Sequence, residues 1–529
     1  MASSNGRAPP AAPLGHPLSR SERLLRLETS RFDLVVVGGG ITGAAVAVEA
    51  ATRGASVALV ERDDYAVGAS GNTSKLLHGG LRYLAQGKVG LVHEALLERS
   101  RLLSELDRSW VHPIPFLLPM AGSAPSRLRD RFGTWLYERL AGRHRLGPRT
   151  ILDRTRVLEL VPALNPQGLH GGVMYWEALV DDVALTLFRI ESADRAGAIV
   201  ANHVEVLSSE PEPGGGFRLK AQEILSGREI SIRSRWVVDA TGAWMGRVPL
   251  LSRNAPRLKP SKGIHLVFRR DKLRIGVAVV LPGPDGRPTF VLPAGSLLIV
   301  GTTDTAYGGD PGQVHSEPPD VAYLLSTIRT GFPSLSVHTS DIVDVYSGVR
   351  PLLASSASTT SELSREDVEA YDPSGAIAVA GGKLTTHRAM ARRAIRPLAL
   401  SASEVSTPKE RPSLGPPPSL AGGAAPLSSG TELVARLVED PRPEDWEELR
   451  RRVLRAIEVE QAESLEDVVD RRLHALNRRE AGFEKVLHTV AGIIAELRTE
   501  STEFRDASVG AYLERRKREY AALELTRDG

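Results

Sequence analysis

The sequence predicts a protein of the α/β class, α+β overall, in which a parallel-sheet domain carries an inserted antiparallel sheet and is followed by a helical domain. Three observations lead to this prediction. Short apolar runs alternate with helix-favouring segments near the N-terminus, strand-like segments occupy the middle, and the last part of the chain is charged and helix-favouring. A length of 529 residues exceeds what one hydrophobic core usually serves, so two or three domains are expected.

The composition is that of an ordinary globular protein, with 42% hydrophobic and 25% charged residues and a formal net charge of +3. So small an excess does not indicate nucleic-acid binding, and no RNA- or DNA-binding motif is present. The absence of Cys excludes disulfides, thiol catalysis and iron–sulfur ligation by cysteine. No apolar run reaches the roughly 18–20 residues that cross a bilayer. No residues have metal-ligand spacing, so no metal site is predicted.

Residues 1–30 are predicted to be a disordered, basic arm that ends in a short helix over Ser21–Glu28. This segment is rich in Ala, Pro and Ser and then in Arg. It lacks the apolar middle of a secretory signal. The folded part of the chain is therefore expected to begin near residue 31.

A glycine-rich turn follows the first apolar run and is typical of a nucleotide site. Gly38, Gly40 and Gly43 form the pattern GxGxxG. The first glycine allows a tight turn, the second lets a pyrophosphate approach the backbone, and the third lets the helix pack closely against the strand. The N-terminus of the following helix, over Ala44–Thr52, would face the phosphates.

The segments around this turn complete a strand–turn–helix–strand unit. Leu34–Val37 and Val57–Val60 are short apolar runs, as expected for strands buried on both faces. Glu61 stands at the tip of the second strand, where its carboxylate could accept hydrogen bonds from a ribose diol. A glycine-rich turn in an unrelated α/β domain would not explain this glutamate.

The nucleotide-binding domain is predicted to be assembled from separated segments, with a substrate-covering domain threaded between them. Trp236–Gly242 and Ala376–Ala380 are predicted as further strands of the first domain, whereas His265–Phe268 and Leu297–Val300 indicate an antiparallel sheet. Flavoprotein oxidoreductases are commonly built in this way. The expected ranges are about 31–100, 176–250 and 346–400 for the first domain, 101–175 and 251–345 for the second, 401–429 for a Pro/Gly/Ser/Ala linker, and 430–529 for the helical domain.

Seven further motifs decide which family this chain resembles. They are Thr73–Leu84, Val180–Asp182, Asp239–Trp244, Lys262–His265, Val300–Asp304, Tyr346–Leu352 and Gly381–Thr386. In this order and spacing they resemble the FAD-dependent, respiratory glycerol-3-phosphate dehydrogenases, over about residues 31–400 and more loosely in the C-terminal domain. The resemblance implies an FAD-binding Rossmann-like domain with an antiparallel substrate domain, as in the D-amino-acid-oxidase-like group.

The activity that the resemblance implies is oxidation of sn-glycerol 3-phosphate to dihydroxyacetone phosphate. The flavin would take the hydride and pass electrons to a quinone at the membrane. The protein would be cytoplasmic. Two further points stay open, namely peripheral attachment to the inner face of the cell membrane and the formation of a homodimer. Three alternatives stay open as well: a glycerol-3-phosphate oxidase, a related enzyme acting on another 2-hydroxy acid or an amine, and a non-catalytic FAD-binding protein.

The resemblance also assigns residues to FAD. Ser74–Leu76 would touch the flavin, Asp239–Gly242 would close around the phosphates, Val204 would contact the adenine, and the backbone amides of the loop at Gly382 would meet the flavin pyrimidine edge. The full predicted set is Gly38, Gly40, Gly43, Glu61, Arg62, Ser74, Lys75, Leu76, Val204, Asp239, Thr241, Gly242, Gly382, Lys383, Leu384 and Thr385.

Oxidation of a secondary alcohol further requires a proton acceptor and cations for the phosphate. His78 and His265 are both candidates for the acceptor, because imidazole titrates near neutral pH; a hydrogen-bonded core histidine is the alternative for each. Arg350 is predicted to be catalytic, through phosphate binding or through stabilisation of the developing alkoxide. The resemblance implies that Arg82, Arg365 and Lys383 bind substrate, with a surface salt bridge as the alternative for each. Tyr83 is a further candidate for substrate binding, with simple packing as its alternative.

The sequence departs from the family pattern at three places. Pro293-Ala294 stands where many relatives have Pro-Trp, His387 replaces a common Tyr, and Asp470–Leu473 stands where Arg-Arg-Thr is usual. These departures affect substrate fit and the contact made by the C-terminal domain, and leave the FAD motifs intact.

A basic stretch over Arg127–Arg149 carries Phe132, Trp135, Leu136 and Leu140 at helical spacing. Such a helix could lie on an anionic membrane surface. The alternative is a helix packed on the core with a solvated basic face.

Overall fold

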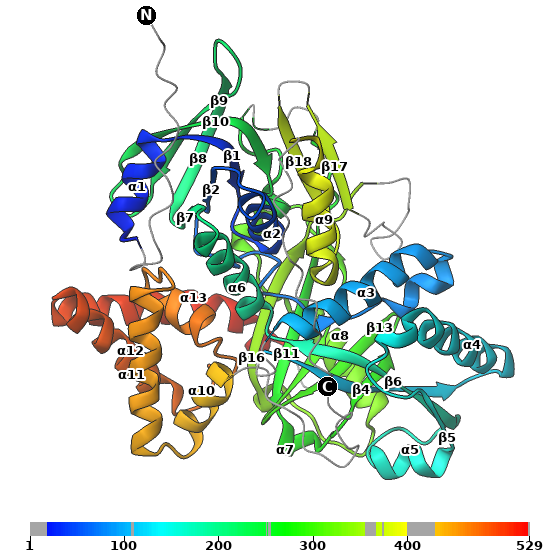
Figure 1. Cartoon of the computed structure of the whole chain (residues 1–529). Helices are drawn as coiled ribbons and strands as arrows, with labels where there is room; N and C mark the ends of the chain where they lie inside the picture. Colours follow the sequence, from blue (N-terminus) through cyan, green and yellow to red (C-terminus); the bar gives the residue numbers. More distant parts are fainter. Residues whose placement is uncertain are drawn as a thin grey trace, which may run out of the picture.

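The computed structural model describes residues 18–106, 110–249, 251, 255–354, 367–372, 375–398 and 429–526. It contains two sheets, one above the other in Figure 1, and a helical domain that lies beside both. The predicted N-terminal arm before residue 18 and the linker up to residue 428 lie outside the described residues. The short helix expected over Ser21–Glu28 is present as α1 (Arg20–Thr29).

The first sheet has a parallel centre, as predicted from its apolar runs. Strands β18, β10, β1, β2 and β7 follow one another in parallel, β17 is added antiparallel at one edge, and β8 and β9 extend β10 as an antiparallel ribbon. The strands are β1 (Arg31–Val37), β2 (Val57–Val60), β7 (Ile199–Ala201), β8 (Val204–Pro211), β9 (Phe217–Glu223), β10 (Glu229–Asp239), β17 (Asp367–Tyr371) and β18 (Ala376–Gly381).

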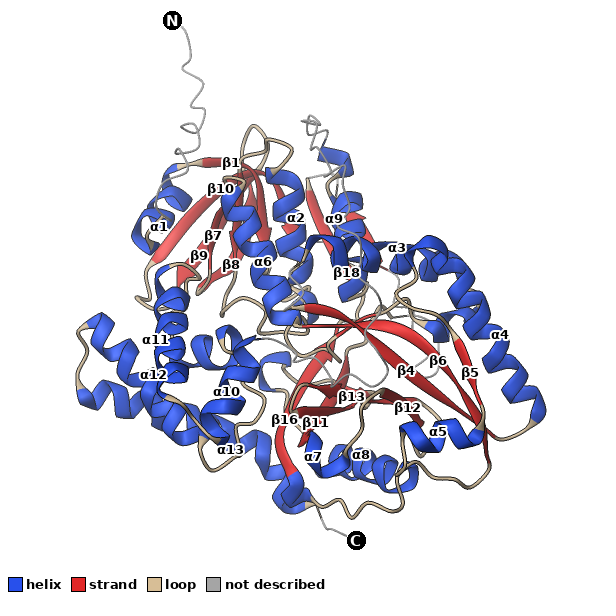
Figure 2. Cartoon of the chain, turned by 60° about the horizontal axis from the view of Figure 1, so that its bottom comes forward, coloured by secondary structure: helices blue, strands red, loops and turns tan. Residues whose placement is uncertain are grey.

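Both faces of the first sheet are buried, which explains why its strands are continuously apolar. Leu34 and Val36 of β1 pack against α2 (Ile41–Ala51), α6 (Asp182–Arg195) and α9 (His387–Ala394). The alternate residues Val35 and Val37 pack on the other side with α1 and the β8–β10 ribbon. Figure 2 shows α2, α6 and α9 gathered on one face of this sheet.

The second sheet is almost entirely antiparallel, and among the described strands only β4 and β12 run parallel to each other. Its central pairs are β4 with β6 and β11 with both β14 and β16. The strands are β3 (Leu76–Leu77), β4 (Val111–Ala121), β5 (Thr150–Leu152), β6 (Leu169–Val180), β11 (Ser261–Arg269), β12 (Ala278–Pro282), β13 (Pro288–Ala294), β14 (Leu297–Gly301), β15 (Thr305–Ala306) and β16 (Ile342–Arg350).

Two of the expected segment boundaries fall inside strands of this second sheet. The boundary at residue 346 divides β16, which pairs with β11 from Ile342 to Arg350. The boundary at residue 176 divides β6, which pairs with β4 along its length. Strand-like sequence resumes at both positions. Hydrogen bonds along the whole length of β16 and of β6 place each strand entirely in the second sheet.

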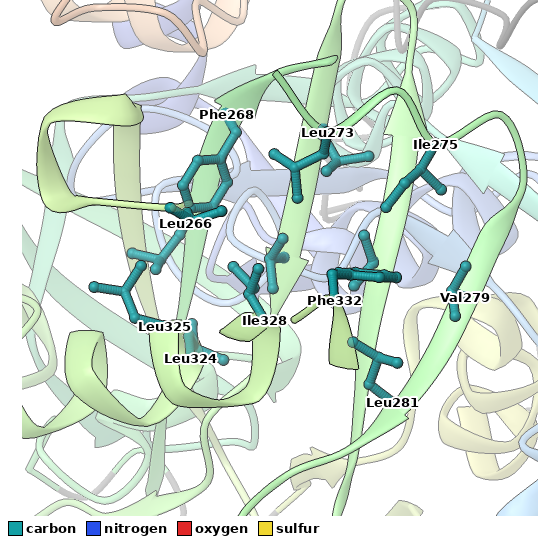
Figure 3. Close-up of a cluster of buried hydrophobic side chains, with 14 of the residues drawn as sticks. Leu266, Phe268, Leu273, Ile275, Val279, Leu281, Leu324, Leu325, Ile328 and Phe332 are labelled. Atoms are coloured by element: carbon teal, nitrogen blue, oxygen red, sulfur yellow. The ribbon is translucent and has the colours of Figure 1, made fainter. Parts of the chain in front are cut away.

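Five helices surround the second sheet and build its core. They are α3 (Val89–Glu105), α4 (Ala124–Ala141), α5 (Arg154–Leu160), α7 (Arg270–Leu273) and α8 (Pro318–Gly331). Leu324 and Ile328, four residues apart on one face of α8, point toward Leu266 and Leu281 of the sheet (Figure 3). Each such buried side chain stabilises the fold by roughly 1.5–3 kcal/mol.

The C-terminal domain is helical, as predicted. It contains α10 (Ser429–Glu439), α11 (Pro443–Glu458), the π-helical turn η9 (Asp467–Arg472), α12 (Phe483–Arg498) and α13 (Thr502–Leu525). Its own core includes Leu433, Leu449 and Val490. Helix α13 leaves this core and packs on α8 and β16, where Ala522 and Leu523 enter the core of the second sheet.

Candidate active site

A cavity of about 1280 Å³ lies between the two sheets. The glycine turn and Glu61 line it from the first sheet, and His265 and Arg350 line it from the second. Small-molecule sites usually measure about 300–1,000 Å³. The cavity therefore has room for a large cofactor and a small substrate together.

The glycine turn has the geometry that its spacing predicts. Gly38 has φ +113, and a Cβ there would lie 2.5 Å from the Ala240 carbonyl oxygen. A Cβ on Gly43 would overlap the Gly38 carbonyl oxygen, so Gly43 lets α2 pack against β1. Gly40 lines the cavity at the start of α2, and a Cβ there would lie 3.0 Å from Ser70 Oγ. The turn thus forms a backbone cradle at a helix N-terminus, which suits a pyrophosphate.

Glu61 and Arg62 lie at the tip of β2 and line the cavity. The Glu61 carboxylate accepts hydrogen bonds from the backbone N–H groups of Gly39 (2.6 Å) and Asp63 (2.9 Å). Burial raises the pKa of Glu61 despite these bonds. The guanidinium of Arg62 lies 5.4 Å from the centre of the Trp244 ring, and Val204 lines the cavity close by, with its N–H donating to the Glu61 carbonyl (2.7 Å).

The turn after β10 places Thr241 and Gly242 in the cavity wall and Asp239 behind it. Asp239 is buried, and its carboxylate accepts hydrogen bonds from the backbone N–H (3.1 Å) and hydroxyl (2.6 Å) of Thr241. Asp239 therefore fixes the shape of the turn and does not itself line the cavity.

The loop after β18 begins with Gly381 and Gly382, both at φ +76. Lys383, Leu384 and Thr385 then line the cavity immediately before α9, and their contact with a cofactor stays a prediction. The Thr385 hydroxyl accepts a hydrogen bond from the backbone N–H of His78 (3.1 Å). This contact joins two predicted motifs that lie about three hundred residues apart in the sequence.

Ser74 and Leu76 line the cavity, but Lys75 between them does not. The Lys75 side chain is fully buried, and its ammonium lies 2.6 Å from the Asp182 carboxylate. The predicted flavin contact of Lys75 is thus confined to its backbone, because the side chain is engaged behind the cavity wall.

His265 lies in the cavity wall on β11 and is buried. Its Nε2 is 2.9 Å from Ser74 Oγ, and its ring stacks on Tyr346 at a centroid distance of 4.7 Å. Burial, together with the charges of Arg350 and Lys75, holds the pKa of His265 well below its usual value. The imidazole is therefore neutral near pH 7 and able to accept a proton.

Four other predicted site residues meet at the same cavity. His78, Arg82, Tyr83 and Lys383 line it. The Lys383 ammonium lies 3.8 Å from the centre of the Tyr83 ring, which is 4% exposed. Tyr83 thus packs against the lysine by a cation–π contact.

Arg350 stands at the end of β16 and lines the cavity. Its guanidinium donates to Thr302 Oγ1 (2.7 Å) and to the Thr303 carbonyl (3.2 Å), and it lies 3.8 Å from Asp304. A side chain at Gly263 would overlap it, so this glycine makes room for the guanidinium. Arg365, also predicted to bind substrate, lies outside the described residues.

No role is predicted from the sequence for Thr302, Tyr346 or Arg287. Thr302 and Arg287 line the cavity, whereas Tyr346 stacks on the lining residue His265. Thr302 and Tyr346 lie inside motifs that were recognised, so their positions were signalled although their contacts were not. Arg287 lies in none of the motifs. It lines the cavity and donates to the Asp304 carbonyl (2.7 Å), which places a further cation near Arg350.

The cavity wall also contains a set of apolar side chains. They come from β4, β6, β12, β13 and α4 and from Leu164, which precedes β6. They are Phe116, Leu118, Phe132, Leu136, Leu164, Leu169, Tyr175, Val280, Leu281 and Phe290. A small phosphate ester does not need this apolar region, which indicates room for a second, apolar ligand.

Helix α4 is packed on one face and exposed on the other. Tyr137 is buried, and its hydroxyl accepts a hydrogen bond from the Gly79 backbone N–H (2.8 Å). On the outer face Leu128, Phe132 and Trp135 are 68%, 58% and 42% exposed, and the two aromatic rings lie 5.5 Å apart. The helix is thus packed on the core on one side, and contact of its exposed face with an anionic membrane surface stays a prediction. Across the described residues, no helix is sufficiently long and apolar to cross a membrane.

The departure at Asp470–Leu473 is compatible with a contact between the C-terminal and first domains. Arg471 and Arg472 both bind the buried carboxylate of Asp64. His387 is also buried, and its Nδ1 lies 2.7 Å from the carbonyl of Leu384 in the cavity loop. These two departures are therefore accommodated by contacts within the chain.

Comparisons with known proteins agree with this geometry. Residues 33–396 match the family model described as FAD dependent oxidoreductase. Glycerol-3-phosphate dehydrogenase 2 of Mycobacterium tuberculosis is 39% identical over 397 residues, 75% of this chain and 67% of the relative. Aerobic glycerol-3-phosphate dehydrogenase of Bacillus subtilis is 35% identical over 381 residues, 72% of this chain and 68% of the relative. The crystal structure of the Bacillus halodurans glycerol-3-phosphate dehydrogenase complexed with FAD has a TM-score of 0.71 at 26% identity, and covers 94% of this chain and 97% of that one.

Proposed function

The chain belongs to the FAD-dependent oxidoreductase family and, within it, to the glycerol-3-phosphate dehydrogenases, and from this premise we propose that it oxidises sn-glycerol 3-phosphate to dihydroxyacetone phosphate. The observation that carries the proposal is the meeting of a dinucleotide cradle, a neutral buried histidine and several cations around one cavity. A dinucleotide site alone would fit many substrates, whereas the cations favour a phosphate ester.

FAD fits the residues of the first sheet. Gly38 and Gly40 would admit the pyrophosphate, Glu61 would bind the ribose, and the amides before α9 would meet the flavin ring. Lys383 and the α9 N-terminus would stabilise negative charge on the ring. When bound, FAD supplies the hydride acceptor.

Arg82, Arg350 and Lys383 would bind the phosphate and orient the glycerol backbone. All three line the cavity, as His265 does. Arginine can hold two phosphate oxygens at once, whereas lysine acts as a point charge. We assign Arg365 to the same group from its motif, since it lies outside the described residues.

His265 would accept the hydroxyl proton. It is neutral near pH 7 because burial and two neighbouring cations oppose its protonation. Once a proton arrives, the imidazolium would be unstable there and would release it readily. His78 lines the same cavity and is the second candidate.

A quinone is the electron acceptor that suits the apolar part of the cavity. This part continues to α4, whose Phe132 is both exposed and in the cavity wall. An α4 that lies on an anionic lipid surface would bring an apolar acceptor to the cavity. We therefore propose a cytoplasmic protein attached peripherally to the membrane through α4.

The decisive experiment is an anaerobic visible spectrum of the purified holoprotein before and after addition of sn-glycerol 3-phosphate. Bleaching of the flavin band would support cofactor and substrate together. A yellow protein that does not bleach would contradict the proposed substrate. Re-oxidation of the bleached protein by a short-chain quinone, much faster than by air, would distinguish a dehydrogenase from an oxidase.

A further inference from the structure

We infer that Thr73, Lys75 and Asp182, supported by His474 of the C-terminal domain, are positioning residues that hold Ser74 against the imidazole of His265. The inference rests on the proposed function for its catalytic meaning. The contacts alone support the structural part of the inference, which is that this cluster fixes one orientation of the His265 ring.

The orientation of the His265 ring depends on Ser74. The bond between Ser74 Oγ and His265 Nε2 (2.9 Å) is the only hydrogen bond of this ring within the part of the chain that the structure describes. The other ring nitrogen, Nδ1, is buried without a hydrogen-bond partner there. Stacking on Tyr346 fixes the plane of the ring, but it does not decide which nitrogen faces which neighbour. Ser74 is therefore what sets the orientation of the ring.

The position of Ser74 is fixed by its two neighbours in the sequence. Both of its neighbours are bound to the carboxylate of Asp182. Thr73 donates to it from its backbone N–H (3.0 Å) and its hydroxyl (2.7 Å), and the Lys75 ammonium donates to it at 2.6 Å. The Thr73 hydroxyl also accepts from the Lys75 backbone N–H (2.8 Å). The Ser74 backbone is thus fixed from both sides.

Lys75 adopts this arrangement at a conformational cost. Its φ of +57 is uncommon for a residue with a side chain. Lys75 and Asp182 are also completely buried, and a buried ion pair gains little over an apolar pair of the same size. A strained, buried ion pair directly behind a site residue is better explained by the geometry it imposes than by the stability it adds.

The C-terminal domain supports this cluster through His474. His474 Nδ1 lies 2.8 Å from Asp181, and its Nε2 lies 3.8 Å from Asp182. Asp181 in turn caps α6 by accepting from the Ala184 N–H (2.9 Å), so His474 supports the helix start that presents Asp182.

The same domain also reaches the stacking partner of His265. Arg478 and Arg516 bind the buried carboxylate of Asp344 on β16 at 2.7 and 3.2 Å. Two residues further along β16, the Tyr346 ring stacks on His265 and its hydroxyl donates to the Thr73 carbonyl (3.1 Å). Contacts from the C-terminal domain therefore reach Asp182, which binds both neighbours of Ser74, and Asp344, which lies two residues before Tyr346.

The test compares Thr73→Val with Thr73→Ser in the full-length FAD holoenzyme. The valine keeps the shape and loses both hydroxyl bonds, whereas the serine keeps them. We expect Thr73→Val to lower the rate of flavin reduction at saturating sn-glycerol 3-phosphate at least tenfold, with the substrate Kd changed less than threefold. Thr73→Ser should stay within twofold of the parent. Equal rates for both variants would overturn the inference.

The role of the C-terminal domain is tested by His474→Gln against Arg471→Gln. Both residues are buried at the same domain contact, but Arg471 binds Asp64, which has no contact with this cluster. We expect only His474→Gln to slow flavin reduction, with both variants lowering the unfolding temperature. Slowing of both in proportion to lost thermal stability would show that the contact is merely structural.

A measurement without substrate separates this inference from the proposed function. The ¹⁵N resonances of the His265 imidazole in the holoenzyme should form one set in the parent and in Thr73→Ser, and more than one set in Thr73→Val and His474→Gln, because the ring then adopts more than one orientation. If the parent is not bleached by sn-glycerol 3-phosphate, the proposed function fails, and these resonances still decide whether the cluster positions the ring. A single, identical set in all four proteins would contradict the inference.

Discussion

The two sides of the cavity are built in different ways. On the cofactor side the groups that would meet a ligand are largely backbone atoms of short local segments, such as the turn of Gly38–Gly43. On the substrate side they are side chains from distant segments, such as His265 and Arg350, which β11 and β16 bring together. The first side is thus specified by local sequence and the second by long-range packing, and substitutions should affect them differently.

The largest expected effect comes from Gly43→Ala on the cofactor side. Its Cβ would overlap the Gly38 carbonyl oxygen, which must shift because the overlap is with backbone. We expect loss of FAD, and therefore of all turnover, with a destabilisation of about 1–3 kcal/mol from overpacking. Flavin content after gel filtration and thermal unfolding measure these outcomes.

Gly492→Ala is the matched control for this variant. A Cβ at Gly492, inside α12, meets nothing within 4 Å. Alanine is favoured over glycine in a helix by roughly 0.5–1 kcal/mol, so FAD content should be unchanged and stability equal or higher. A Gly43→Ala protein with full FAD content would contradict the view that the backbone of the glycine turn determines cofactor binding.

The next effect is that of Arg350→Ala on the substrate side. The variant should retain FAD, because Arg350 contacts Thr302 and Thr303 of the second sheet. Loss of a cation at the reacting centre should lower kcat/KM for glycerol 3-phosphate by about 10²–10³. Arg269→Ala removes a half-exposed arginine of β11 that binds Asp271, Glu439 and Glu480 and should leave kcat/KM unchanged. Unchanged kinetics in Arg350→Ala would reject its site assignment.

The pH profile should distinguish the two histidines. Because burial and nearby cations lower the pKa of His265, the acid limb of kcat/KM should lie below the usual imidazole value of about 6.5. The unfolded chain then binds more protons than the native one below that pH, so stability should also decline as pH falls. His265→Gln should abolish the limb, and His78→Gln should keep it. The reverse result would make His78 the proton acceptor.

The smallest effect concerns the outer face of α4. The double variant Phe132→Ser/Trp135→Ser should bind phosphatidylglycerol vesicles at least about tenfold more weakly, because two exposed apolar side chains would no longer enter the lipid. Vesicle sedimentation measures the binding. Leu25→Ser, at a 58% exposed position of α1, is the control and should bind normally. Equal binding by all three proteins would exclude α4 as the contact.

The same comparison explains what could be predicted from the sequence. The strand–turn–helix–strand unit and Glu61 depend on local spacing, and the structure has them where the pattern places them. The role of Arg287 was not predicted, because this residue lies outside every recognised motif and reaches Asp304 only through the pairing of β13 with β14. The burial of the Lys75 side chain against Asp182 could not be predicted, since nothing local signals this partner, and the contact of Lys75 with the flavin stays a prediction.

Helix α13 has a consequence for how the protein is made. The core of the second sheet contains Leu117 of β4 and also Leu523 near the end of α13. A ribosome that has released β4 must therefore synthesise some four hundred further residues before this core is complete. Until then, nascent chains of this protein would expose the apolar surface that Leu523 covers, which is the condition in which chaperones bind and aggregation begins.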